Sequence, residues 1–214
     1  MRHQVLWFFA ALSLVSGIAA AEPFRYRAQP ERARAWVIDA GELLLEQAGK
    51  PRRAITLPDW QWADQPYACA PDIALGPRGE VIVTSNVLPV LWKIDPETLR
   101  VSVHRLELDS DMDKDVGFSG LVYSARNGAY FAVSGLHGSL WRIDPLLRRA
   151  QKVGLSRSLR GACAVSVQRQ ERPSVVSRLC VHGEAVSLAP DQRSAYVQPA
   201  GCSSNAFALI EGLR

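Results

Sequence analysis

A repeat of 49 residues constrains the fold of this chain more than any other feature. Residues 91–96 read Leu-Trp-Lys-Ile-Asp-Pro, and residues 140–145 read Leu-Trp-Arg-Ile-Asp-Pro. At the same offset Gly79 corresponds to Gly128, and each glycine precedes a strand-like apolar run. Units repeated at such a period bury their apolar faces against neighbouring copies. The chain is therefore expected to stack related units side by side.

The local signals within the repeat are those of short β-strands. Val, Ile, Tyr and Trp are concentrated in short runs, and turns rich in Pro, Gly, Asn and Asp separate these runs, as at 77–79, 95–98 and 126–128. Helical periodicity is weak, and residues 41–47 are the one short segment that could form a helix. A unit of this length with about four strands has the size of a propeller blade.

A longer pattern runs from Pro71 through Gly79 (Pro-Asp-Ile-Ala-Leu-Gly-Pro-x-Gly), continues at Val81–Val83 and ends at Trp92–Pro96. With this pattern, residues 71–108 and 118–153 resemble blades of the bacterial propeller repeats in the gluconolactonase/regucalcin-like and YVTN-type families. The resemblance implies an all-β, propeller-like fold in which the Trp-x-Ile-Asp-Pro segment closes the outer part of each sheet.

The gluconolactonase-like side of the resemblance also implies a metal-dependent lactonase or esterase. By position, Asp72 and Asn86 resemble the loop ligands of such enzymes, and Glu184 is the candidate third ligand. The acidic ligand near the N-terminus of those enzymes has no clear counterpart in this sequence.

Two degenerate copies of the repeat flank the clear ones. Residues 35–39 resemble the Leu-Trp-x-Ile-Asp unit, and residues 186–197 resemble its strand–turn–strand part. The mature chain therefore holds about four blades. Three architectures remain open: a compact four-bladed propeller, a partial ring completed by self-association or by a partner, and an open β-sandwich of related hairpins.

The first 21 residues have the order of a secretory signal peptide. A short basic start precedes an apolar run from Val5 to about Val15, and Ala19 and Ala21 satisfy the small-x-small rule for cleavage. This stretch is shorter than the roughly 20 apolar residues of a membrane span. We expect cleavage after Ala21, one mature domain over 22–214 with no membrane span, and a periplasmic or secreted location.

The charge pattern argues against a nucleic-acid partner. The formal net charge is +4, and the cations are scattered among acids instead of forming the clustered basic face of a nucleic-acid binder. A local group of arginines is expected to be a solvated N-terminus, with contacts to anionic groups as the alternative; it consists of Arg25, Arg27, Arg32 and Arg34.

An even number of cysteines in an exported chain suggests disulfides. The segment from Cys163 to Cys180 reads as two strands around a polar turn, and the midpoint between the two cysteines lies in that turn. We therefore expect a cross-hairpin disulfide between them, which leaves Cys69 to pair with Cys202. Free buried thiols are the alternative.

Four carboxylates at alternate positions form the sharpest local feature, and they are Asp109, Asp111, Asp113 and Asp115. Oxygen-rich loops of this kind suit Ca²⁺, which is the one candidate cofactor. The stretch is not an EF-hand, because Lys114 and Gly120 occupy the positions of its glycine and its last glutamate. A solvated loop between two blades is the alternative.

No catalytic residue is assigned. Ser119 lies in Gly-Phe-Ser-Gly-Leu, which lacks the last glycine of the G-x-S-x-G elbow, so a turn residue is expected there. His104 is expected in an outer strand. His137 and His182 are expected in loops, where they could meet at the mouth of the propeller as a base or as metal ligands.

Aromatic residues mark a candidate recognition loop. Residues 57–67 are bounded by prolines and contain Trp60, Trp62 and Tyr67. Loop aromatics contribute strongly to binding, although such a loop could also pack over the end of the ring as a plug. Trp36, Trp92 and Trp141 form a second set, which we assign to packing between blades.

The leading hypothesis is an exported, non-catalytic binding or scaffold module. It would take an envelope protein or a small ligand through loops on one face, with the loop aromatics and the two loop histidines as contacts. The alternatives are the metal-dependent hydrolase and an accessory factor of a periplasmic dehydrogenase.

Overall fold

The computed structural model describes residues 25–39, 41–63, 69–109, 116–168, 178–198 and 202. The expected signal peptide, Tyr67 and three of the four alternating aspartates (Asp111, Asp113 and Asp115) lie outside the described residues. Within the described ranges the chain forms strands and one short 3-10 turn, η1 (Pro30–Arg32). No helix in these ranges is long and apolar enough to cross a membrane. The predicted all-β class is confirmed.

The strands form four antiparallel units of four strands, which we call blades 1 to 4. Blade 1 consists of β1 (Arg25–Gln29), β2 (Arg34–Asp39), β3 (Glu42–Gln47) and β4 (Arg53–Ile55). Blade 2 consists of β5 (Ile73–Leu75), β6 (Val81–Thr84), β7 (Val90–Ile94) and β8 (Val101–Arg105). The expected blade at the clearest copy of the repeat is therefore present.

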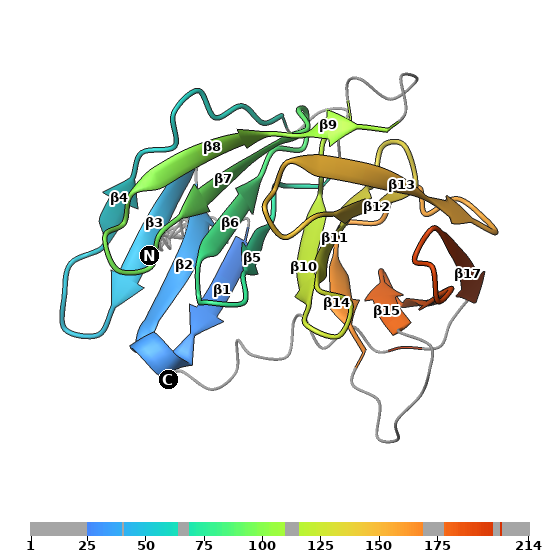
Figure 1. Ribbon diagram of the computed structural model, residues 1–214. Coiled ribbons are helices and arrows are strands. Elements are labelled where there is room, and N and C mark those ends of the chain that lie inside the picture. The colour runs from blue at the N-terminus through green and yellow to red at the C-terminus, as the bar shows by residue number, and fades with distance from the viewer. Residues whose placement is uncertain are drawn as a thin grey trace, which may run out of the picture.

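Blades 3 and 4 follow the same order. Blade 3 consists of β10 (Gly120–Ser124), β11 (Ala129–Ser134), β12 (Ser139–Ile143) and β13 (Arg149–Leu155). Blade 4 consists of β14 (Val165–Val167), β15 (Arg178–Val181), β16 (Glu184–Leu188) and β17 (Ser194–Gln198). The first strands lie innermost, since β5 contacts β1 and β10, and β10 contacts β14 (Figure 1). The prediction of about four propeller-like blades is confirmed.

The aspartate of the repeat explains the turn that follows the third strand. Asp95 Oδ1 accepts hydrogen bonds from the backbone N–H and the hydroxyl of Thr98 and from the N–H of Glu97, and these bonds lower the pKa of its carboxyl. After β12, Asp144 Oδ1 accepts a bond from the N–H of Leu146, and its Oδ2 accepts one from the N–H of Arg148. An Asp side chain that caps its own turn in this way ends a strand sharply, so the Ile-Asp-Pro sequence sets the reversal into the fourth strand.

Apolar side chains fill the space between consecutive blades. On β6, Val81 and Val83 belong to the cluster shared with blade 1, whereas Ile82 belongs to the cluster shared with blade 3. This alternation follows from the two-residue period of a strand. The tryptophans assigned to inter-blade packing are 0–1% exposed in these clusters, as expected; they are Trp36, Trp92 and Trp141.

The outer strands are joined into a rim. The short strand β9 (Glu107–Leu108) continues β8 and pairs in parallel with β13 of blade 3. The other end of β13 pairs in parallel with β17, through Gly154 opposite Ser194. Neighbouring blades are thus connected at their periphery as well as at their inner strands.

Two expectations about the first blade are wrong. Residues 42–47 form strand β3 and not a helix, because β2 and β4 pair with both of its edges and Leu43 and Leu45 are buried on one face. Trp36 lies on the second strand of its blade, whereas Trp92 and Trp141 lie on third strands. The Ala-Trp-Val-Ile-Asp segment therefore resembles the repeat in sequence but occupies a different strand of its blade.

The predicted disulfide pairing is also wrong. β14 and β15 form the expected hairpin, but their register places Ser166 opposite Cys180. Cys163 precedes Ser166 by three residues, so it does not face Cys180 across the hairpin. The disulfides instead join Cys69 to Cys163 and Cys180 to Cys202. The first connects segments 94 residues apart, at the starts of blades 2 and 4.

Candidate functional site

The loops before each inner strand meet at one end of the blades, which we call the loop end. Arg25 Nη2 at the start of β1 donates hydrogen bonds to the carbonyl oxygens of Ala70, Ser119 and Cys163, at 3.4, 3.3 and 2.7 Å. These carbonyls come from the chain just before β5, β10 and β14. One guanidinium group therefore ties blade 1 to the other three.

Asp72 lies beside this arginine and is 5% exposed. Its Oδ1 accepts a hydrogen bond from the N–H of Ile73 and lies 3.7 Å from Arg25 Nε and 3.8 Å from Arg27 Nη2. Its Oδ2 accepts a bond from the N–H of Leu121 in β10 at 2.9 Å. Both oxygens of this candidate metal ligand therefore already join blades 1, 2 and 3.

Asn86, the second candidate ligand, holds the tryptophan loop. Its Nδ2 donates to the carbonyl oxygens of Ala63 and Cys69, and its Oδ1 accepts a bond from the N–H of Ala63 at 3.0 Å. All of its hydrogen-bonding groups are used in these contacts. The described ends of the loop are thus fixed to the turn between β6 and β7.

The two described tryptophans of this loop are half-buried, with ring centroids 6.4 Å apart. Trp60 Nε1 donates to the carbonyl oxygen of Thr84 at 2.9 Å. Trp62 packs near Gly41, where an added Cβ would lie 3.3 Å from its Nε1. The loop therefore packs over blades 1 and 2, and the rings of Trp60 and Trp62 each remain partly exposed.

The remaining described candidate ligands lie elsewhere. Glu184 on β16 forms an ion pair with Arg157, and Asp109 Oδ1 accepts a bond from the N–H of Lys152 at 2.8 Å. Across the described part of the chain, no three His, Cys, Asp or Glu side chains are grouped as a metal site. The structure thus places Asp72 and Asn86 at the ends of neighbouring strands of blade 2 and Glu184 in blade 4.

Ser119 acts as a turn residue. Its hydroxyl oxygen accepts a bond from the N–H of Gly135 at 3.0 Å and lies 2.9 Å from the carbonyl oxygen of Ala162, to which it donates. His104 lies on the outer strand β8, as expected. Burial and the nearby Lys93 lower the pKa of His104, and its ring lies 3.0 Å from the Ser102 hydroxyl.

The other two histidines are exposed in loops at the loop end. His182 lies between β15 and β16, and His137 lies between β11 and β12 beside Leu136, which is 38% exposed. Gly135 and Gly138 fix the ends of the second loop: the N–H of Gly161 donates to the Gly135 carbonyl at 2.7 Å, and that of Leu159 to the Gly138 carbonyl at 2.9 Å. Leu136 and His137 therefore project from a fixed loop.

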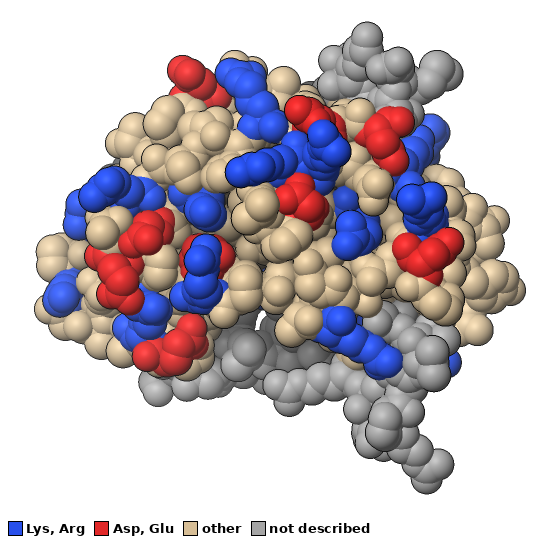
Figure 2. Space-filling view, in the orientation of Figure 1, with Lys and Arg blue, Asp and Glu red and all other residues tan. Residues whose placement is uncertain are grey.

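The expectation of a solvated arginine cluster is wrong. Arg25 and Arg27 contact Asp72, Arg32 forms an ion pair with Glu97, and Arg34 Nη2 donates to the Pro96 carbonyl at 2.8 Å. All four arginines thus join blade 1 to blade 2. Elsewhere on the face shown in Figure 2, Lys and Arg are interspersed with Asp and Glu, as the scattered sequence charges predict.

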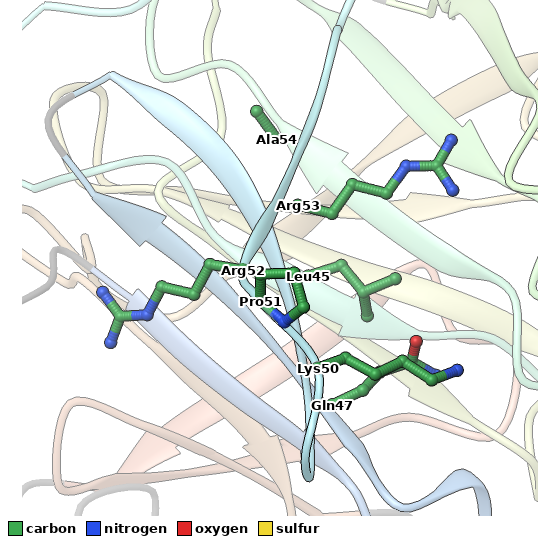
Figure 3. A pocket seen from close by; sticks show the side chains of 7 residues that line it. All are labelled: Leu45, Gln47, Lys50, Pro51, Arg52, Arg53 and Ala54. Carbon is green, nitrogen blue, oxygen red and sulfur yellow. The ribbon is translucent and has the colours of Figure 1, made fainter.

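A cavity of about 590 Å³ lies at the opposite end, around the β3–β4 turn. Figure 3 shows Lys50 and Arg53 extending to the same side as Leu45, whereas Arg52 points the other way. Arg52 forms an ion pair with Glu46. The cavity is cationic, and none of its lining residues is predicted from the sequence to be part of a site.

Comparisons with known proteins support the fold alone. No protein-family model and no curated protein match the chain. A catalytically inactive virginiamycin B lyase from Staphylococcus aureus, solved with quinupristin, is similar at a TM-score of 0.60 and 13% identity, over 85% of this chain and 57% of that chain. The selenomethionine-substituted lyase from the same organism gives 0.57 and 12%, over 81% and 54%.

A third similar structure is an auxiliary nutrient binding protein from Bacteroides thetaiotaomicron, with a TM-score of 0.52 and 12% identity over 85% of this chain and 43% of that chain. The present chain thus spans about half the length of the structures it matches. The similar structures include a lyase and a nutrient binding protein, so the shared fold does not identify the function of this chain.

Proposed function

We propose that this protein is an exported binding module, and that the loop end of its blades receives a protein or small-molecule partner. The proposal rests chiefly on Leu136 and His137, which project from a loop whose two glycines are fixed by backbone hydrogen bonds. A loop that is already ordered loses little conformational entropy when it binds. The partly exposed rings of Trp60 and Trp62 add aromatic surface at the same end.

Two observations support export. The order of residues 1–21 is that of a signal peptide, and disulfides persist mainly in oxidising compartments such as a bacterial periplasm. The metal-dependent hydrolase is less well supported, because Asp72 and Asn86 direct their polar atoms to backbone groups. An accessory factor of a periplasmic dehydrogenase would be one form of such a binding module.

Site-specific photocrosslinking tests the loop end as the binding surface. A photoreactive amino acid replaces Leu136 or His137 in the mature protein, which is then irradiated in an envelope extract of the host. The matched control replaces Leu146, which belongs to the same blade, is 61% exposed and lies in the turn at the opposite end.

We expect one discrete adduct from positions 136 and 137 and none from position 146. Excess unlabelled protein should compete for the adduct, whereas excess Leu136→Asp protein should not. Adducts of equal yield at both ends, or no adduct at the loop end, would refute the proposal.

A further inference from the structure

The outer edge of blade 2 carries unpaired backbone groups. In the β7–β8 hairpin the N–H of Asp95 donates to the carbonyl of Arg100, and the N–H of Leu106 donates to that of Pro89. Hydrogen-bonded pairs alternate with non-bonded ones in an antiparallel ladder. The register therefore directs Ser102 and His104 toward β7, and directs the N–H and C=O groups of Val101, Val103 and Arg105 outward.

The same edge already accepts a strand a few residues further on. The outward N–H of Glu107 donates to the carbonyl of Arg148 at 2.8 Å, and that of Asp109 donates to Ala150 at 3.1 Å. This is the parallel pairing of β9 with β13. Among the described residues, no backbone hydrogen bond continues this pairing onto β8, so the edge is occupied along one half and open along the other.

Exposed arginines and one apolar side chain lie at the open half, next to two acids that already have partners: Glu107 is paired with Arg149, and the Asp144 oxygens accept backbone N–H groups. Val103 is 41% exposed, and Arg105 and Arg148 are exposed beside the junction of β8 and β9. Neither arginine forms an ion pair with a carboxylate of the described residues. Figure 2 shows Lys and Arg side chains over the region of β8, β9 and β13, interspersed with Asp and Glu.

We propose that the open edge of β8 is a docking site for an extended, acidic segment of a partner protein, which adds to blade 2 as a further strand. The backbone groups of Val101, Val103 and Arg105 would supply the hydrogen bonds. Val103 and Arg105 lie on one face of β8, so acidic side chains on the matching face of the segment would pair with Arg105, near Arg148, and their aliphatic parts would cover Val103. Strand addition to an exposed edge is a recurring mode of peptide recognition. The site lies on the rim, so this inference goes beyond the binding proposed for the loop end.

A labelled peptide of alternating Val and Glu is the probe, and fluorescence anisotropy measures its binding to the mature protein at low salt. Val103→Pro removes one outward N–H, which does not bond to β7, and proline is tolerated at such edge positions. We expect it to weaken binding about tenfold, a loss comparable to one hydrogen bond to a strand.

Charge variants keep the test valid if the proline variant fails to fold. Arg105→Glu should weaken binding about fivefold at low salt, since it reverses a charge at the edge. Arg178→Glu makes the same change at the one exposed residue of β15 in blade 4 and should leave binding unchanged. A Val–Lys peptide should bind at least about tenfold more weakly than the Val–Glu peptide.

Hydrogen exchange provides a second readout. In the free protein the amides of Val101, Val103 and Arg105 should exchange faster than those of Ser102 and His104, and the Val–Glu peptide should slow the first set. Equal affinities for the two peptides, or no protection of these amides at saturating peptide, would overturn the proposal. The arginines would then serve to keep the edge from pairing, as charged residues on edge strands do.

Discussion

At the scale of single residues, the side chains that look most suited to chemistry are the ones that hold the blades together. The Asp72 carboxylate accepts backbone N–H groups from blades 2 and 3 while it lies near two arginines of blade 1. The Ser119 hydroxyl joins the chain of blade 3 to the segment before blade 4. A buried polar group needs such partners, since an unpaired one costs about 1–3 kcal/mol.

His104 should make the stability of the protein depend on pH. Burial and Lys93 lower its pKa in the folded protein, whereas the unfolded chain has the usual value of about 6.5. The unfolded state therefore binds more protons. The contribution of His104 to the free energy of unfolding is complete above about pH 6.5 and is lost as the pH falls through the folded pKa. Chemical denaturation from pH 7.5 to pH 5 should show a larger loss of stability for the wild type than for His104→Gln.

An equal loss of stability in the two proteins would contradict this prediction. A direct control is the NMR titration of the His104 ring, whose midpoint should lie below the usual value for histidine.

The sequence could indicate which residue types matter at the loop end, but not their partners. By its position in the sequence Asp72 resembles a loop ligand of a metal-dependent lactonase. Its actual contacts with Arg25 and Arg27 depend on how blade 1 packs against blade 2, which spacing along the chain does not reveal. The same holds for Cys163, because a shift of three residues in a hairpin register is invisible in the spacing of cysteines.

At the scale of elements, the repeat predicts strands well where its turn chemistry is complete. The Asp-Pro turns after β7 and β12 carry capping aspartates, and both segments take the predicted places in their blades. The segment around Trp36 has the same apolar pattern without the proline, and it forms a second strand instead of a third. Apolar periodicity identifies a strand, whereas the turn residues identify its place in the blade.

A side chain at Gly117 should destabilise the contact between two segments of the chain. A Cβ on Gly117 would overlap the backbone atoms of Asn86 and Val87, which are held by the tryptophan loop. Because backbone cannot move aside as a side chain can, Gly117→Ala should destabilise the protein by about 3 kcal/mol or more. Gly154 is the matched control, because a Cβ there would meet only Arg193 O at 3.5 Å and Ser194 Cβ at 4.0 Å.

Chemical denaturation at 25 °C measures both glycine variants. Gly154→Ala should be neutral or stabilising by about 0.5 kcal/mol, since alanine restricts the unfolded chain. A Gly117→Ala variant as stable as the wild type would contradict the close approach of the two segments.

At the scale of the whole molecule, consecutive blades share apolar clusters, and the two disulfides connect segments of different length. Cys69–Cys163 closes a loop of 94 residues that spans blades 2 and 3, whereas Cys180–Cys202 closes one of 22. The entropy of loop closure grows with loop length, and it amounts to about 5 kcal/mol for the longer loop and about 3 kcal/mol for the shorter.

Replacing each pair of cysteines with serine tests this difference. Under non-reducing conditions the Cys69→Ser/Cys163→Ser protein should unfold at lower denaturant than the Cys180→Ser/Cys202→Ser protein. The reverse order, or a Cys163–Cys180 peptide in a non-reducing digest, would contradict the connectivity of the blades.

We expect the polar residues of the loop end to join blades and not to hold a catalytic metal. The most direct test is thermal unfolding of the metal-stripped wild type and Asp72→Asn, each with and without Ca²⁺, Mg²⁺, Mn²⁺ or Zn²⁺. Breaking the buried contacts should cost about 3 kcal/mol, which lowers Tm by roughly 6–12 °C without any metal.

We expect this difference in Tm to be the same in every ion. An equal rise of Tm in both proteins would mean that the ion binds away from Asp72, for example at the predicted Ca²⁺ site at 109–115. An ion that raises the Tm of the wild type and not that of Asp72→Asn would contradict the account and return Asp72 to the role of a metal ligand.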